Sequence, residues 1–153
     1  MKPKLFWDSS GLPAAIMSSN ENSPGRLVLK MGEAGAVDMR VSREVLSDCD
    51  RVLRRINPER VKQLAIILHQ ANIATTFDPN PETVERCFEM TGYESDARVL
   101  AAAIECDADL FLTQDIEHFL QNPLIGPPDT NLRVVTLYQA LEWVRGRLMA
   151  LDE

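Results

Sequence analysis

Four acidic residues stand where predicted strands end or predicted helices begin, rather than on a solvated face. Asp8 and Asp115 each follow a short apolar strand, Glu44 lies in the first turn of a helix, and Asp96 begins one. In open parallel sheets, catalytic groups gather at the carboxyl ends of strands. Two carboxylates about 5 Å apart repel by roughly 3 kcal/mol at a dielectric of about 20, so such a cluster requires a cation. Oxygen ligands favour Mg²⁺ or Mn²⁺ and phosphodiester chemistry.

Two of these acids also have an ordinary structural explanation. Asp96 would cap the helix that it begins, and Glu44 would complement the dipole of its helix. Asp8 and Asp115 are harder to explain in this way, because two separate apolar strands both end in carboxylates. Asp115 in particular has no predicted cap to make, so it is the sharpest indicator of a functional site.

The segment from Asp96 to Phe119 contains half of this predicted site. Its apolar residues recur at helical spacing up to Cys106, which predicts a helix over 96–106. The apolar run at 110–113 then predicts a strand that is buried on both faces.

Other elements must bring the remaining acids to the same place. We expect strands at 5–7 and 133–136, and a half-exposed strand towards an edge at 37–41. A short helix is expected through 14–17, after turn and cap residues at 9–11, with further helices at 43–56, 82–90 and the carboxyl terminus. Ser42 would cap the helix at 43–56, and a second helix follows Pro58. Residues 26–31 are ambiguous between helix and strand. Strands alternating with helices predict a three-layer α/β/α fold with a central, mostly parallel sheet.

Composition bounds the class of protein. A chain of 153 residues with 45% hydrophobic content predicts a single domain over 1–153. No apolar run approaches the roughly 18 residues that span a bilayer, and the amino-terminal apolar stretch is too short for a signal peptide, so we expect a cytoplasmic protein. Three widely spaced cysteines are expected to be buried thiols.

The net charge of −7 argues against a nonspecific nucleic-acid coat protein. Five basic residues nevertheless cluster between positions 51 and 62: Arg51, Arg54, Arg55, Arg60 and Lys62. Either a solvated helix face or a surface that follows phosphates explains this cluster. Two other classes of protein are disfavoured. A phosphatase with an aspartate nucleophile needs a second acid where Ser10 stands, and a receiver domain needs a late lysine, whereas none follows Lys62.

Over nearly its whole length the chain resembles the PIN domain, particularly the VapC-type toxin ribonucleases. The resemblance rests on an ordered set of motifs: Asp8-Ser9-Ser10, Ser42-Arg43-Glu44-Val45, Asp96 on an alanine-rich helix, and Leu112-Thr113-Gln114-Asp115 with His118-Phe119. It implies a Mg²⁺- or Mn²⁺-dependent endoribonuclease, with the toxin of a toxin-antitoxin pair as one role. A PIN-like protein- or RNA-binding module without turnover is the alternative.

The resemblance also implies roles for individual residues. Asp8, Glu44, Asp96 and Asp115 would be the catalytic acids. The three aspartates would hold the metal, and Glu44 would order a second ion or the attacking water. Ser10 would orient Asp8, and Thr113 would likewise orient a carboxylate.

The remaining expectations concern the histidines and the partners. Glu117 and His118 stand where family members often carry a further acid, but neither His118 nor His69 is predicted to be a ligand. The expected partners are an RNA substrate, an antitoxin protein and a second copy of the chain, bound through residues 43–72 because Ile66 and Ile67 lie partly off the buried stripe of their helix.

Overall fold

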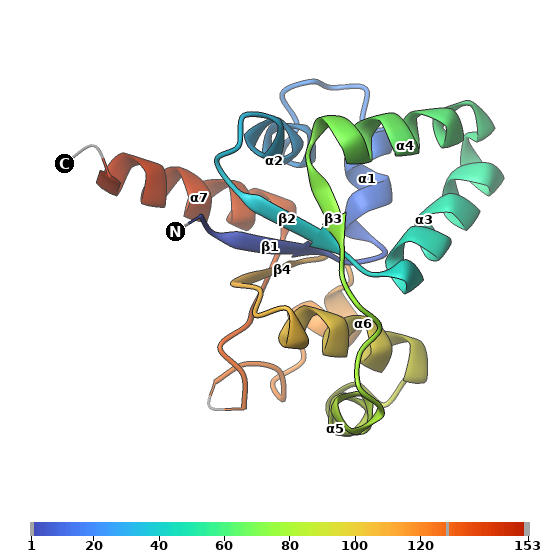
Figure 1. Ribbon diagram of the computed structural model, residues 1–153, viewed down its shortest axis with the longest axis vertical. Helices are drawn as coiled ribbons and strands as arrows, with labels where there is room; N and C mark the ends of the chain where they lie inside the picture. The colour runs from blue at the N-terminus through green and yellow to red at the C-terminus, as the bar shows by residue number, and fades with distance from the viewer. Residues whose placement is uncertain (1, 128, 152–153) are drawn as a thin grey trace.

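The computed structural model describes residues 2–127 and 129–151. Its middle layer is a five-stranded sheet in the order β3-β2-β1-β4-β5, in which all four pairings of neighbouring strands are parallel (Figure 1). The strands are β1 (Lys4–Trp7), β2 (Asp38–Val41), β3 (Ile73–Thr75), β4 (Leu110–Leu112) and β5 (Arg133–Val135). The predicted parallel α/β fold is therefore confirmed.

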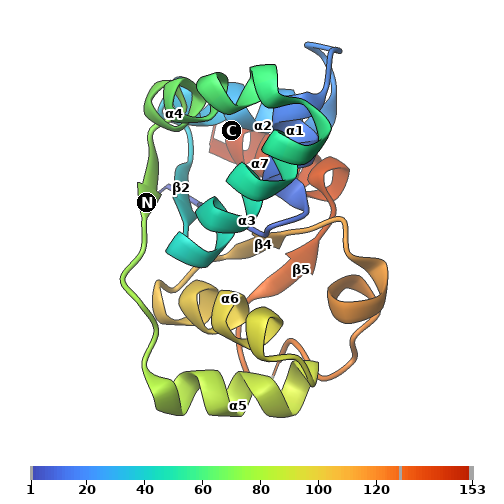
Figure 2. The ribbon, with the colours of Figure 1, turned by 90° about the vertical axis from the view of Figure 1, so that its right-hand side faces the viewer.

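Helices cover both faces of this sheet (Figure 2). One layer contains α1 (Gly11–Met17), α2 (Pro24–Glu33), α3 (Arg43–Ile56), α4 (Val61–Gln70) and α7 (Leu137–Leu151). The other contains α5 (Pro81–Thr91) and α6 (Glu94–Glu105). Two short turns complete the fold: the 3₁₀ turn η1 (Pro58–Arg60) and the π turn η2 (Ile116–Leu120). Within the described residues, no helix is both long and apolar enough to cross a membrane.

Residues 5–7 of β1 and all of β4 are buried because their side chains are apolar on both faces, whereas Lys4 at the start of β1 is half-buried. Phe6 and Phe111, which are register partners on these strands, stack with their ring centroids 5.8 Å apart. Where the strands end, Gly11 allows α1 to begin directly against β4. A Cβ atom at Gly11 would lie 2.7 Å from the Leu112 carbonyl oxygen, so a larger residue there would push the two chain segments apart. This close approach places the 8–10 loop beside the residues that follow β4.

Several sequence predictions require correction. The ambiguous residues 26–31 belong to α2. β2 lies between β1 and β3, so it is not an edge strand, and β3 itself was not predicted. The helix expected to start at Asp96 begins at Glu94, which places Asp96 in its first turn. Ser42 does cap α3, because its Oγ accepts a hydrogen bond from the Val45 N–H at 3.3 Å.

The three cysteines are free thiols. Cys49 and Cys87 are buried as expected, whereas Cys106 is half-buried. Burial raises the pKa of Cys49 to about 12 and that of Cys87 to about 11, so both thiols are protonated near neutral pH.

Candidate active site

A pocket of about 320 Å³ opens at the carboxyl ends of β1 and β4, between α3 and the start of α6. Four carboxylates line it, and they come from four separate segments of the chain: Asp8, Asp48, Asp96 and Asp115. Three of these were predicted from sequence, as was Ser10, which also lines the pocket. The fold therefore brings most of the predicted acidic set to one place, as the ends of adjacent parallel strands should.

Asp8 is the most deeply buried acid of the pocket, with 4% of the residue exposed. Its Oδ2 atom accepts hydrogen bonds from Ser10 Oγ at 2.9 Å and from Thr113 Oγ1 at 2.7 Å. Burial raises the pKa of the Asp8 carboxyl, and the hydrogen bonds from Thr113 and Ser10 offset part of this rise. The site thus holds a carboxylate in a place where its charge is costly.

The two hydroxyl groups also hold the residues that follow β4. Ser10 Oγ accepts a hydrogen bond from the Gln114 N–H at 2.9 Å, and Thr113 Oγ1 accepts one from the Asp115 N–H at 3.0 Å. Each hydroxyl has one proton, which it donates to Asp8. The two hydroxyl oxygens lie 3.1 Å apart, but no proton is left to form a hydrogen bond between them. The structure thus places both predicted orienting residues on Asp8, and both tie the end of β1 to the end of β4.

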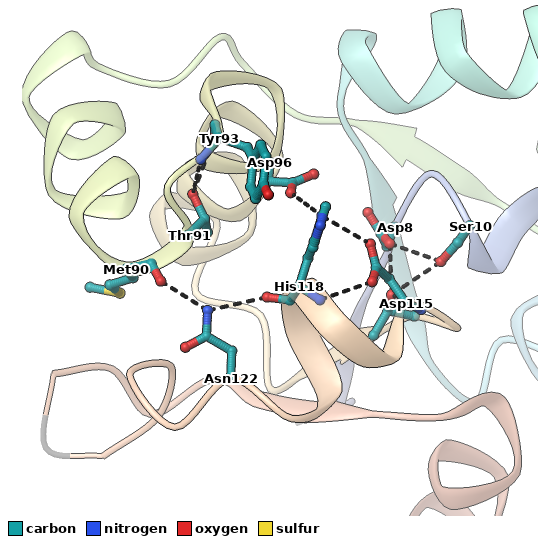
Figure 3. Close-up of polar contacts among 10 residues, drawn as sticks. Asp8, Ser10, Met90, Thr91, Tyr93, Asp96, Asp115, His118 and Asn122 are labelled. Atoms are coloured by element: carbon teal, nitrogen blue, oxygen red, sulfur yellow. Dashed lines mark hydrogen bonds and ion pairs between the residues drawn. The ribbon is translucent and has the colours of Figure 1, made fainter.

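His118 lies between two of the acids, as Figure 3 shows. Its Nδ1 atom is 2.8 Å from Asp96 Oδ2 and 3.4 Å from Asp115 Oδ2. Tyr93 stacks on the imidazole ring at 4.4 Å between centroids. Burial raises the pKa of Asp96, His118 lowers it, and the nearby Asp115 and Asp48 carboxylates raise it further. Sequence reasoning missed this position of His118 because only the folded chain brings η2 beside α6.

Asp115 has a local role that was not expected. Its Oδ1 atom accepts a hydrogen bond from the His118 backbone N–H at 3.0 Å and so caps η2. The prediction that Asp115 has no cap to make is therefore wrong. Capping uses only Oδ1, however. Asp115 Oδ2 remains free of the cap and lies 3.4 Å from His118 Nδ1.

Glu44 is absent from the residues that line the pocket. Its carboxylate pairs instead with Arg98, through Nη2 to Oε1 at 3.0 Å and Nε to Oε2 at 3.2 Å. Asp48, one turn further along α3, lines the pocket in its place. One Asp48 oxygen accepts a hydrogen bond from Ser9 Oγ at 2.7 Å, and the other pairs with Arg51 Nη2 at 2.6 Å.

A signal for Asp48 was present in the sequence. Val45, Cys49 and Leu53 form the buried stripe of α3, and the half-buried Asp48 lies beside it, three residues after Val45 and four before Val52. A carboxylate beside an apolar stripe is unusual, because burying it without a partner costs several kcal/mol. Such a position indicates a functional acid more strongly than the first turn of a helix, where Glu44 stands.

The donor chemistry of the pocket fits a hard divalent cation. Carboxylate oxygens are the ligands that Mg²⁺ and Mn²⁺ prefer, and no cysteine lines the pocket. Across residues 2–127 and 129–151, however, no three acidic, histidine or cysteine side chains are close enough to hold one ion in their present positions. The pocket is thus a set of suitable ligands rather than a closed coordination shell, and Asp96 faces His118 within it.

Comparison with known proteins identifies the fold. No family model matches the sequence, and neither does any curated protein. Among solved structures, PAE2754 from Pyrobaculum aerophilum superposes with a TM-score of 0.61 at 13% identity, covering 95% of this chain and 98% of that one. VapBC2 from Rickettsia felis, solved with a DNA fragment from its promoter, gives 0.63 at 16% identity, covering 87% and 98%. The chain therefore shares the fold of these two structures, which is the PIN-like fold that its sequence motifs predict.

Proposed function

We propose that this protein is a Mg²⁺- or Mn²⁺-dependent endoribonuclease that hydrolyses phosphodiester bonds in RNA. The observation that carries the proposal is the pocket in which Asp8, Asp48, Asp96 and Asp115 converge at the carboxyl ends of two parallel strands. A cluster of acids in one pocket is destabilising unless it serves a cation. The PIN-like fold supports the same reading, by analogy.

Each acid has a distinct part in this proposal. Asp8, held by Ser10 and Thr113, supplies a fixed oxygen ligand, while Asp96 and Asp115 supply oxygens that now face His118. We assign the fourth acidic position to Asp48 rather than Glu44, because Asp48 lines the pocket. When bound, the divalent ion would lower the pKa of a water molecule and offset charge on the phosphate.

Cleavage of RNA by the purified protein tests this proposal directly. We expect cleavage in Mn²⁺, loss of cleavage in EDTA, and loss in Asp8→Asn and Asp115→Asn. Titration calorimetry should show Mn²⁺ binding to the wild type and much weaker binding to both variants. If the wild type binds no Mn²⁺ and the variants behave as it does, the enzymatic proposal is wrong.

A binding module without turnover is the second candidate, and one observation favours it. The acids within the described residues are not gathered closely enough for three of them to hold one ion, and Asp96 is hydrogen bonded to His118. On this alternative, RNA or a protein partner binds equally well in EDTA and in Mn²⁺, and no product forms. A gel assay that separates bound RNA from cleaved RNA distinguishes the two functions.

The partners remain proposals as well. The Rickettsia felis structure contains VapBC2, so we propose an antitoxin protein as a partner of this chain. We also propose a homodimer through α3, η1 and α4, because Ile56 and Ile66 are 58% and 54% exposed on these helices. Ile67, by contrast, is half-buried and packs on the core. Sedimentation of the wild type and of Ile66→Asp measures the oligomeric state. We expect the wild type to be a dimer and the variant to be a monomer.

A further inference from the structure

We infer that Arg51 contacts a phosphate of the RNA strand at the acidic pocket and thereby positions the substrate. This inference rests on the proposed ribonuclease function, and it assigns one residue of the basic cluster at 51–62, which the sequence left open between a solvated helix face and a surface that follows phosphates. Arg51 lies on α3, where its side chain is 72% exposed, and it is the one lysine or arginine among the described residues that line the pocket.

The guanidinium is held at the mouth of the pocket rather than left free in solvent. Arg51 Nη2 lies 2.6 Å from Asp48 Oδ1, and the other oxygen of Asp48 accepts a hydrogen bond from Ser9 Oγ. Ser9 belongs to the loop that also carries Asp8. An arginine has five N–H donors in a planar fork, so its contact with Asp48 leaves donors for a phosphate.

Charge explains why such a residue is needed. RNA must bring a negatively charged phosphate into a pocket lined by four carboxylates. One divalent ion does not neutralise four ionised carboxylates, so an approaching phosphate still meets net negative charge. Arg51 supplies positive charge at the entrance, and its fork matches two phosphate oxygens at once.

The simpler explanation is that Arg51 forms an ordinary surface ion pair on a helix. Such pairs contribute little to stability, and α3 offers a matched control. Arg54 lies three residues later and pairs in the same way, with Nε 2.8 Å from Asp50 Oδ2 and 66% of its side chain exposed. Arg54 does not line the pocket. A purely structural role predicts the same behaviour for both residues.

The test compares Arg51→Met, Arg51→Lys and Arg54→Met with the wild type. The first measurement is kcat and KM for Mn²⁺-dependent cleavage of a single-stranded oligoribonucleotide. The second is the affinity of the same fluorescein-labelled strand in Ca²⁺, by anisotropy at several KCl concentrations. The third is Mn²⁺ affinity of the RNA-free protein, by calorimetry, and thermal unfolding checks that each variant folds.

We expect Arg51→Met to weaken RNA binding about tenfold and to reduce the slope of log affinity against log salt by about 0.7, the loss of one phosphate contact with a single strand. Arg51→Lys should keep the slope, and Arg54→Met should change affinity by less than about twofold. Mn²⁺ should bind RNA-free Arg51→Met as tightly as the wild type or more tightly, because a repelling positive charge has been removed. A structural defect would instead weaken the binding of both RNA and Mn²⁺.

The outcomes separate this inference from the function on which it rests. If the wild type cleaves RNA and Arg51→Met matches Arg54→Met in KM and salt slope, the inference about Arg51 is wrong and the ribonuclease proposal stands. If Arg51→Met loses affinity for RNA and for Mn²⁺ together, Arg51 maintains the structure of the pocket rather than contacting a phosphate, and the inference is again wrong. If the wild type fails to cleave RNA in Mn²⁺, the proposed function and the inference both fail.

Discussion

His118 Nδ1 lies 2.8 Å from Asp96 Oδ2, so an imidazole from η2 is hydrogen bonded to an acid in the first turn of α6. The ring is held on its other side by stacking against Tyr93, and the His118 backbone N–H is bound by Asp115. This arrangement joins two of the proposed metal ligands through one side chain. From this arrangement we predict that His118 positions the acids of the pocket.

His118→Ala should therefore reduce Mn²⁺-dependent RNA cleavage by about 10- to 100-fold, the usual cost of losing a residue that orients a metal ligand. The pKa of Asp96 should also rise, because His118 lowers it in the wild type. The pH profile of cleavage then shifts its acidic limb upward. His69→Ala is the control, since His69 is exposed on α4. Equal activity of the two variants would contradict a positioning role.

The parts of the fold that were predictable are those with a strong local signal. β1 and β4 are short runs of apolar side chains buried on both faces, and α3 combines an apolar stripe with a capping serine. β3 has no such signal, because only Ile73 of its three residues is even half-buried. The start of α6 was misplaced by two residues, since Tyr93 makes no side-chain cap and Asp96 resembles one.

The candidate site was predictable where an acid follows a strand, as at Asp8 and Asp115. It was not predictable where two elements distant in sequence must meet, because spacing does not report which helix turn faces the sheet edge. His118 depends on such a meeting, because it reaches α6. Asp48 also reaches a distant element, the loop after β1, but its place beside the apolar stripe of α3 was a signal in the sequence. Glu44 satisfied the local pattern, but its nearest partner in the folded chain is Arg98.

Asp48→Asn and Glu44→Gln should separate these two assignments. We expect Asp48→Asn to lower Mn²⁺ affinity and cleavage by at least about tenfold, because it removes a charged oxygen ligand from the pocket. Glu44→Gln removes a half-exposed partner of Arg98 and should change both quantities by less than about threefold. Calorimetry and initial cleavage rates measure the difference. A larger effect at Glu44 would restore the role that the sequence resemblance implies for it.

Thr113→Val should disturb both ends of the hydrogen-bonded network at Asp8. Valine has the shape of threonine but neither donates to Asp8 nor accepts from the Asp115 N–H, so the buried Asp8 carboxylate and the half-buried Asp115 N–H each lose a partner. We expect unfolding free energy to fall by about 1–3 kcal/mol and Mn²⁺ affinity to fall with it. Thr113→Ser keeps the hydroxyl and should retain most of both. Urea denaturation and calorimetry on the pair of variants check this, and equal stability of the two would show that the hydroxyl is dispensable.

Asp8→Asn should make the metal-free protein more stable near neutral pH while abolishing cleavage. Burial raises the pKa of Asp8 from its ordinary value of 3.8, so the folded state binds a proton more tightly than the unfolded chain does. The stability that Asp8 contributes is therefore complete below pH 3.8 and is lost as pH rises through the raised pKa. Asparagine keeps an oxygen for Ser10 and Thr113 but has no charge to bury.

We expect a gain in unfolding free energy on the order of 1 kcal/mol for Asp8→Asn in EDTA near neutral pH, shrinking towards zero as pH falls to 3.8. Adding Mn²⁺ should reverse the order, because only the wild type gains stability from tight ion binding. Asp50→Asn, on the surface of α3, serves as the control and should show neither effect. Urea denaturation across this pH range, with and without Mn²⁺, measures all three proteins. A wild type that is the more stable protein in EDTA would show that the Asp8 charge is not a burden on the fold.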